Sequence, residues 1–199
     1  DIHLPNEIKV KEVGVYCKLS FKNREADKFE DFLVKFKLPK EQKVKNLSRG
    51  MKMKLSLSIA LSHKAELLVL DEATSGLDPV VRDEILDLLL DFLQDENHTV
   101  LISSHILSDL EKTADYIAFL HNGKLLFMEE KDLLLEKYSL CSVDEKTYQN
   151  LDPKAIIGKR KHAFGLDLLV ERSLMPDGIE IQKPSIEDIM VYIIKGEEK

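Results

Sequence analysis

The sequence predicts an α/β protein with a parallel sheet, and three observations support this fold class. Short apolar runs at 67–70, 99–102 and 116–120 have the length of buried strands. Helical patterns separate these runs, one from Pro79 to about Glu96 and one from Ile106 to Thr113. Alternating strands and helices of these lengths are typical of right-handed crossovers between parallel strands. The uninterrupted run at 67–70 is expected to be buried on both faces of the sheet.

Helices are predicted for most of the first third of the chain. A helix is expected from Glu25 to Lys37, and a weaker pattern predicts one from Glu7 to Leu19. Ser48 is placed to cap a third helix that continues to about His63. The longer helix is supported by apolar residues at i, i+3, i+4 and i+7, namely Phe29, Phe32, Leu33 and Phe36.

The last third is predicted to be a small α+β appendage that follows a hairpin and a helix. Asn122-Gly123 is a strong hairpin turn signal after the third strand. A final helix is expected from Ser185 to Ile194, because Ser185 and Asp188 have the spacing of a capping box. The other expected elements are a strand at 124–127, a helix at about 130–138, and β-like pieces at 140–143, 155–157 and 166–170.

Composition limits the classes of partner. The 29 Lys and Arg against 36 Asp and Glu give a net charge of −7, which argues against a general nucleic-acid binder, so no nucleic-acid partner is expected. Two cysteines, Cys17 and Cys141, favour a reducing compartment. No apolar run reaches the roughly 18 residues of a membrane span, so any span is expected to come from another chain.

Two carboxylates, Asp71 and Glu72, follow the first predicted strand directly. The carboxyl edge of a parallel sheet is where open α/β folds bind ligands. In nucleotide hydrolysis an Asp at this place holds Mg²⁺, and a neighbouring Glu orients or deprotonates the attacking water. His105 follows the next strand at the same edge and is a candidate phosphate contact. The alternatives are an acidic cap of the next turn and a histidine at the surface.

The start of the helix at Ser48 is a candidate anion site. The Ser48 hydroxyl, the Gly50 amide and the helix N-terminus together offer donors to a phosphate. An ordinary serine cap is the alternative explanation.

Four motifs in sequence decide between these explanations. They are Leu47-Ser48-Arg49-Gly50-Met51, Leu67-Leu68-Val69-Leu70-Asp71-Glu72, Ser75-Gly76-Leu77-Asp78, and His105. Together they resemble the signature sequence, Walker B strand, D-loop and switch histidine of the ATP-binding-cassette (ABC) ATPases. The resemblance extends from the helical segment before Ser48 to about Glu130. It is most similar to bacterial ATPase subunits that work with a separate permease.

The resemblance implies part of the P-loop NTPase (RecA-like) fold with an ABC helical subdomain, and ATP and Mg²⁺ as ligands. Asp71 would assist Mg²⁺, Glu72 would be the catalytic base, and His105 would contact the γ-phosphate. Ser48 and Gly50 would bind the γ-phosphate held by a second ATPase subunit, identical or different, and Asp78 would couple the two sites. The helical region would contact an integral membrane permease at the cytoplasmic face of the cell membrane.

The domain boundaries implied are 1–63 for the helical subdomain, 64–138 for the second half of the ATPase core, and 139–199 for the appendage. Two departures from the family stand out. Arg49 and Met51 replace the commonest Gly and Gln of the signature. The 199 residues contain no G-x-x-x-x-G-K-[ST] phosphate-binding loop and no glutamine-containing loop before the helical segment.

The missing phosphate-binding loop is expected to lie in an N-terminal part outside this sequence, and true loss of the motif is the alternative. These 199 residues alone are accordingly expected to be inactive as an ATPase. Two rival functions remain open at this point. One is a soluble ABC ATPase of translation or DNA repair, and the other is a degenerate, non-catalytic regulatory cassette. Retention of Glu72 and His105 counts against the second.

Overall fold

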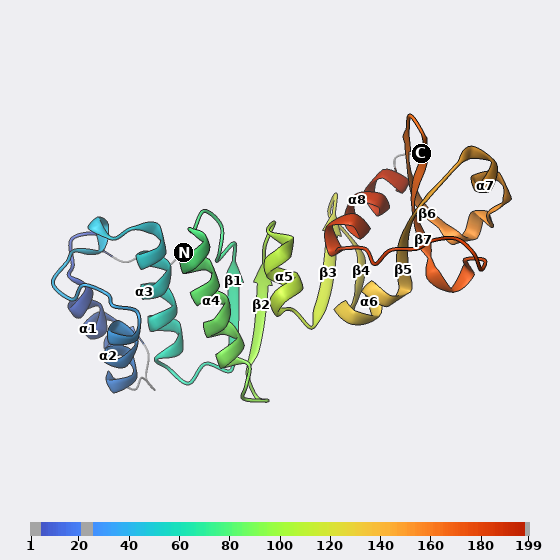
Figure 1. Ribbon diagram of the computed structural model, residues 1–199. Helices are drawn as coiled ribbons and strands as arrows, with labels where there is room; N and C mark the ends of the chain where they lie inside the picture. The colour runs from blue at the N-terminus through green and yellow to red at the C-terminus, as the bar shows by residue number, and fades with distance from the viewer. Residues whose placement is uncertain (1–4, 21–25, 198–199) are drawn as a thin grey trace. The chain divides into compact units, whose positions relative to one another are not determined.

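The computed structural model describes residues 5–20 and 26–197, and the chain divides into two compact units (Figure 1). The first unit ends at Asp109 and the second begins at Leu110. Helix α5 (Leu107–Thr113) contains this boundary. None of the helices formed by the described residues is long and apolar enough to cross a membrane. The three-part division predicted above concerns smaller subdomains and stays a prediction.

The first unit begins with three helices packed around a shared core. These are α1 (Val10–Ser20), α2 (Ala26–Lys35) and α3 (Arg49–Leu61), with a short 3-10 helix, η1 (Val44–Asn46), before α3. Position 25, the predicted start of the second helix, lies outside the described residues. The core combines all three helices with the connecting segment, through Val10, Val13, Phe29, Leu33, Leu38, Val44, Leu47, Leu55 and Ile59. The predicted helices are therefore confirmed.

A parallel strand pair follows, covered by one helix. Strand β1 (Leu67–Asp71) pairs with β2 (Thr99–Ser103), and α4 (Pro79–Phe92) connects them (Figure 1). In the register of this pair Leu68 lies beside Val100, and both pack in the same cluster as Ile85 and Leu89 of α4. This strand–helix–strand unit confirms the predicted parallel crossover.

The prediction that the run at 67–70 is buried on both faces is wrong for the described structure. Leu67 and Val69 are 56% and 66% exposed, whereas Leu68 between them is buried. On β2, Leu101 is also mostly exposed. The reason is that α4 presents one apolar stripe and covers one face of the pair.

The third predicted strand forms a hairpin. Strand β3 (Tyr116–His121) pairs antiparallel with β4 (Lys124–Glu130) in a two-stranded sheet. For the described strands, the prediction that β3 belongs to the parallel sheet is therefore wrong. Asn122 and Gly123 both have positive φ, 47° and 74°, as a two-residue type I′ turn requires. This short connection makes pairing with β4 easy, and the turn signal is confirmed.

The second unit ends in a three-stranded antiparallel sheet with one helix packed on it. The strand order is β5 (Tyr138–Val143), β7 (Gly165–Glu171), β6 (Ile156–His162), and the helix is α8 (Ile186–Glu197). The predicted capping box is confirmed, since the Asp188 amide donates to the Ser185 hydroxyl at 3.0 Å and the Ser185 amide donates to the Asp188 carboxylate at 2.9 Å. The remaining elements are α6 (Lys131–Lys137), α7 (Glu145–Asn150), η2 (Pro153–Ala155) and η3 (Arg172–Leu174), of which α7 was not predicted.

Close packing of α8 on this sheet depends on Gly158 of β6. A Cβ atom at this position would lie 2.4 Å from the carbonyl oxygen of Tyr192 on α8, which is far inside van der Waals contact. Beside it, Leu169 packs against Ile186 and Ile189, and all three are fully buried. A side chain at Gly158 would therefore push the helix from its core contacts.

We expect Gly158→Ala to lower the free energy of unfolding by about 1–3 kcal/mol, because the new methyl group meets backbone atoms that cannot rotate away. Urea unfolding followed by circular dichroism measures the effect. Lys161→Ala, at an exposed position of the same strand, is the matched control and should change stability little. Equal stability of the two variants would show that α8 does not need this close approach.

Candidate functional site

The two parallel strands end side by side, and this places the first candidate carboxylate. Asp71 lies beside Ser103 in the register of β1 and β2. The Ser103 hydroxyl donates a hydrogen bond to Oδ1 of Asp71 at 2.5 Å. The same hydroxyl oxygen accepts from the Glu72 amide at 3.2 Å, and the Ser103 carbonyl accepts from that amide at 3.0 Å. One serine thus fixes both Asp71 and the backbone of Glu72.

Glu72 has a left-handed backbone conformation, with φ of 50°. This conformation is uncommon for a residue with a side chain and costs about 1–3 kcal/mol where the surroundings impose it. Here the amide is held by Ser103, and the Glu72 carbonyl accepts from the Ser75 amide at 3.1 Å. The chain therefore turns sharply after β1.

His105 contacts the Glu72 carboxylate. Its Nδ1 lies 2.5 Å from Oε2 of Glu72, while the histidine side chain stays 67% exposed. The loop that carries His105 is held by Ser104, whose hydroxyl accepts from the Ile106 amide at 3.0 Å ahead of α5. The ends of β1 and β2 thus bring Asp71, Glu72 and His105 together, as the sequence predicts.

The oxygen atoms at this edge fit Mg²⁺. Asp71, Glu72 and Ser103 offer carboxylate and hydroxyl oxygens, the ligands this hard cation prefers. Within the described part of the chain, no group of three or more His, Cys, Asp or Glu side chains could hold a metal ion. Mg²⁺ in nucleotide sites is usually bound by one or two carboxylates together with substrate phosphates and water.

Ser48 begins α3 as predicted. Its hydroxyl oxygen accepts a hydrogen bond from the Met51 amide at 3.2 Å, which is the geometry of a helix cap. The preceding residue, Leu47, is buried in the helical core and anchors the start of the helix. The first turn of α3 therefore has a fixed position.

The start of α3 packs against the start of α4. A Cβ atom on Gly50 would lie 2.9 Å from Cγ1 of Val81, so only glycine allows the two first turns to approach this closely. Asp78 caps α4 by accepting from the Val81 amide at 3.1 Å. Lys54 of α3 and Glu84 of α4 form an ion pair one turn further along.

Gly76 and Arg49 form a second contact between these helix starts. Gly76 has φ of 67°, and a Cβ atom there would lie 2.5 Å from Nη1 of Arg49. The arginine guanidinium therefore lies directly against the loop that precedes Asp78. Arg49 is one of the two residues at which the sequence departs from the commonest signature.

The predicted site residues form two groups in the structure. Asp71, Glu72 and His105 are one group, and Ser48, Gly50 and Asp78 are at the adjoining starts of α3 and α4. Within the described residues, no hydrogen bond or ion pair joins a side chain of one group to a side chain of the other.

Sequence reasoning missed the structural roles of Ser103 and Arg49. The role of Ser103 follows from the strand register, which places it opposite Asp71, and an aligned pair of strands could have indicated it. The Arg49 contact depends on the packing of two helices, and no sequence signal indicates it.

Comparisons with known proteins agree with this geometry. A family model described as ABC transporter matches residues 1–75. The lantibiotic transport ATP-binding protein SrtF of Streptococcus pyogenes is 44% identical over 89 residues, which are 45% of this chain and 38% of that protein. The chain therefore spans less than half the length of this curated relative.

Two further similarities cover more of the chain. The uncharacterized ABC transporter ATP-binding protein YcbN of Bacillus subtilis (strain 168) is 33% identical over 205 residues, covering 92% of this chain and 67% of that protein. A solved structure of the ATP-binding subunit of an ABC transporter matches with a TM-score of 0.59 at 25% identity, covering 66% of this chain and 56% of the solved one. The α/β fold class is thereby confirmed, and the chain belongs to the family of ABC transporter ATP-binding proteins.

Proposed function

We propose that this chain supplies the Walker B, switch-histidine and signature part of an ATP-hydrolysing subunit that drives a membrane transporter. The observation that supports this most directly is the Glu72 carboxylate, held by His105 beside Asp71 at the ends of two parallel strands. Nucleotide hydrolysis requires three groups at one place: a general base, an acid that binds the metal ion, and a hydrogen-bond donor to the phosphate.

Asp71, oriented through Oδ1 by Ser103, would hold Mg²⁺, which neutralises charge on the phosphate oxygens. Glu72 would accept a proton from the attacking water. His105 uses Nδ1 toward Glu72, and its Nε2 has no partner among the described residues. That nitrogen is thus available to contact the γ-phosphate.

The adjoining starts of α3 and α4 would face the nucleotide of a second ABC ATPase subunit, identical or different. Ser48 and Gly50 would bind the γ-phosphate held by that subunit, with the helix N-terminus favouring the negative charge. Asp78 would couple the two sites, since it caps α4 where that helix meets α3.

The remaining partner proposed is an integral membrane permease, contacted by the helical region 1–63 from the cytoplasmic face of the membrane. This is consistent with the function of SrtF, a transport ATP-binding protein. Residues 64–138 would complete the ATPase core, and residues 139–199 would form a separate small domain. Nucleic acid is not among the proposed partners.

We expect Glu72→Gln to reduce ATP turnover by about 10²-fold or more while ATP binding persists, because the amide cannot act as a general base. The measurement is phosphate release and nucleotide binding in a protein that carries this chain behind a phosphate-binding loop. Glu66→Gln, at the other end of β1, removes the same charge from an exposed position and is the control. Turnover close to that of the control would remove Glu72 from the mechanism.

Ser48→Arg is expected to prevent both ATP-induced dimerisation and hydrolysis in the same protein, because it adds bulk and charge where the partner's phosphate would lie. Sedimentation with and without ATP, together with phosphate release, measures the effect. Ser108→Arg adds the same group at an exposed position of α5 and should leave both properties intact. If Ser48→Arg also leaves them intact, the segment is a helix cap alone.

The 199-residue chain by itself is expected to bind Mg-ATP weakly and not to hydrolyse it. Without backbone amides and a lysine around the β- and γ-phosphates, Asp71 and Glu72 present negative charge to the nucleotide. Calorimetric titration and a phosphate-release assay compare this chain with one that includes the phosphate-binding loop. Micromolar binding with turnover by the 199 residues would contradict the expectation.

A further inference from the structure

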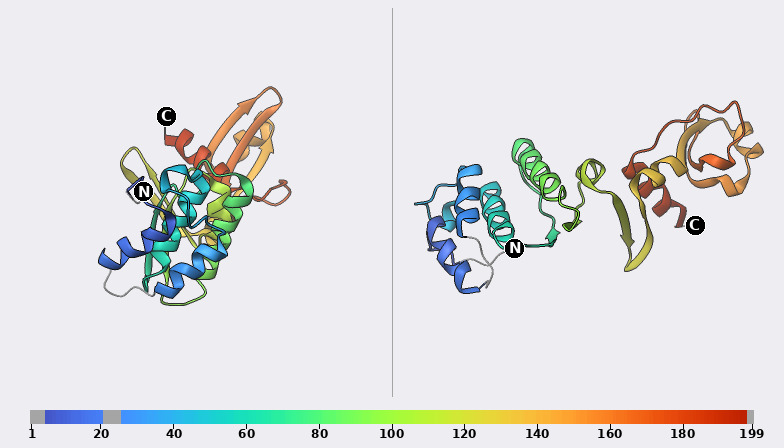
Figure 2. Two further views of the ribbon diagram at one scale, coloured as in Figure 1. Left: turned by 90° about the vertical axis from the view of Figure 1, so that its left-hand side faces the viewer. Right: turned by 90° about the horizontal axis from the view of Figure 1, so that it is seen from below.

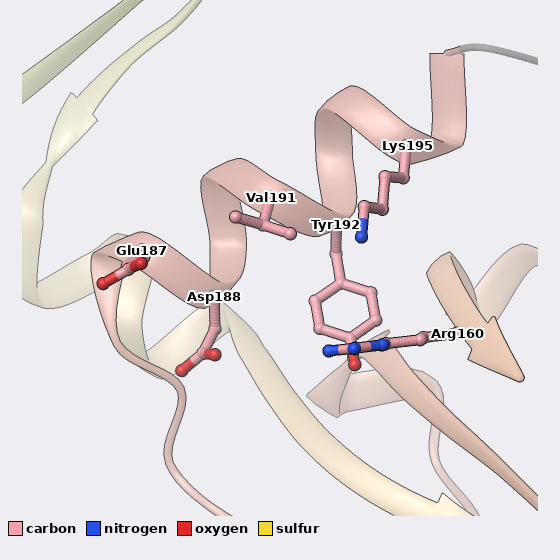
Figure 3. A pocket seen from close by; sticks show the side chains of 6 residues that line it. All are labelled: Arg160, Glu187, Asp188, Val191, Tyr192 and Lys195. Atoms are coloured by element: carbon pink, nitrogen blue, oxygen red, sulfur yellow. The ribbon is translucent and has the colours of Figure 1, made fainter. Parts of the chain in front are cut away.

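The second unit contains a polar cavity between α8 and the sheet β5–β7–β6. Two hollows of about 380 and 220 Å³ share Arg160, Asp188 and Tyr192 in their walls, and Figure 3 shows the side chains that line the smaller one. The larger volume is in the usual range of small-molecule sites. Polar side chains dominate its lining, and the principal ones are Ser142, Arg160, Asp167, Glu180, Asp188 and Tyr192.

The strand register explains why this part of the sheet is polar. Ser142, Asp167 and Arg160 lie side by side across the three strands. Gly158, two residues before Arg160 on β6, pairs with Leu169, two residues after Asp167 on β7. At this pair α8 covers the sheet with apolar contacts. The face under α8 thus changes from apolar to polar at the cavity.

Tyr192 presents an unpartnered polar group to this cavity. Tyr192 is only 9% exposed, yet its hydroxyl forms no hydrogen bond with any described residue. Figure 3 shows its ring extending from α8 toward the guanidinium of Arg160. Burial, with a smaller contribution from Asp167, raises the pKa of the Tyr192 hydroxyl, so it stays protonated and able to donate.

Arg160 is a second group without a partner. Its guanidinium forms no ion pair in the described part of the chain, although Asp167 is its cross-strand neighbour. Oδ1 of Asp167 instead accepts from the Ser142 hydroxyl at 2.6 Å and lies 3.4 Å from Nε2 of His162. The cavity therefore offers a cation and a hydroxyl donor that the chain itself does not use.

Carboxylates also line the two hollows. Oδ2 of Asp188 is engaged by Ser185 in the capping box, which leaves Oδ1 for another group. Glu180 and Glu187 add two more carboxylates, and neither has a hydrogen-bond or ion-pair partner among the described residues. Together with Asp167, four acids and the two cations Arg160 and Lys195 line the two hollows.

We propose that this cavity binds a small zwitterion, with Arg160 and the Tyr192 hydroxyl holding its anionic group and the carboxylates of Asp188 and Glu180 holding its ammonium group. A guanidinium binds a carboxylate or phosphate with two parallel hydrogen bonds, which supplies most of the specificity at one end. The excess of acids at the other end favours a ligand with more ammonium than anionic groups, such as a basic amino acid.

The test is calorimetric titration of the 199-residue chain with L-lysine, O-phosphoethanolamine, acetate and methylammonium. We expect L-lysine to bind, because it combines one carboxylate with two ammonium groups, and each singly charged probe to bind at least tenfold more weakly. Binding of O-phosphoethanolamine in preference to L-lysine would contradict the proposal, because its phosphate carries more negative charge than its one ammonium group offsets.

Variants connect the binding to these residues. Arg160→Gln and Tyr192→Phe should each weaken zwitterion binding about tenfold or more, and Tyr192→Phe keeps the ring that packs in the core. Lys161→Gln removes a positive charge from the next residue of β6 and should leave binding unchanged. Absence of binding by either zwitterion, equal binding of acetate or methylammonium, or binding unaffected by Arg160→Gln and Tyr192→Phe would each overturn the proposal.

Discussion

The pairing of Asp71 with Ser103 at the ends of β1 and β2 is the interaction on which the candidate catalytic group depends. Ser103 donates to the Asp71 carboxylate and accepts from the Glu72 amide, so one hydroxyl joins the two strand ends. Those bonds hold Glu72 in a left-handed conformation that the residue would not adopt alone. A shift of β2 by one residue would turn the Ser103 side chain to the other face of the sheet and release both partners.

The parallel pair depends in turn on α4, and α4 links it to the signature helix. Leu88 and Leu89 of α4 pack in the same cluster as Leu68 of β1 and Leu57 of α3. The first turn of α4 also fits against Gly50 of α3. The same helix therefore positions the strand that ends in Asp71 and the first turn of the helix that Ser48 caps. Displacement of α4 would disturb both groups of candidate residues.

Local signals in the sequence predicted most of the elements, whereas the roles of the six candidate residues come from the resemblance to the ABC ATPases and stay proposals. Ser48, Asn122-Gly123 and Ser185 each specify a cap or turn through chemistry contained in a few neighbouring residues, and all three form as expected. The wrong predictions concern which face or partner an apolar strand finds. Burial of Leu67 and Val69, for example, depends on a second covering layer that a run of apolar residues does not specify.

The contacts within the site were not predictable for a related reason. Arg49 meets Gly76 because two helix starts converge, and Ser103 meets Asp71 because of the register between strands whose paired residues are 32 positions apart in the chain. The cavity beside Tyr192 requires the approach of α8 to Gly158, which is again a tertiary contact. Sequence patterns specify periodicity and local hydrogen bonding, whereas these contacts arise from the packing of whole elements.

The structural and chemical roles proposed for the candidate residues are compatible because each role uses different atoms. The Ser48 oxygen accepts from Met51, which leaves its O–H hydrogen to donate to an anion. His105 directs Nδ1 to Glu72 and keeps Nε2 for another partner. Asp71 is held through Oδ1, and Oδ2 stays available to a cation. A helix cap or a buried contact at these positions therefore does not argue against a role in nucleotide binding, because it fixes one atom of the side chain and orients the other.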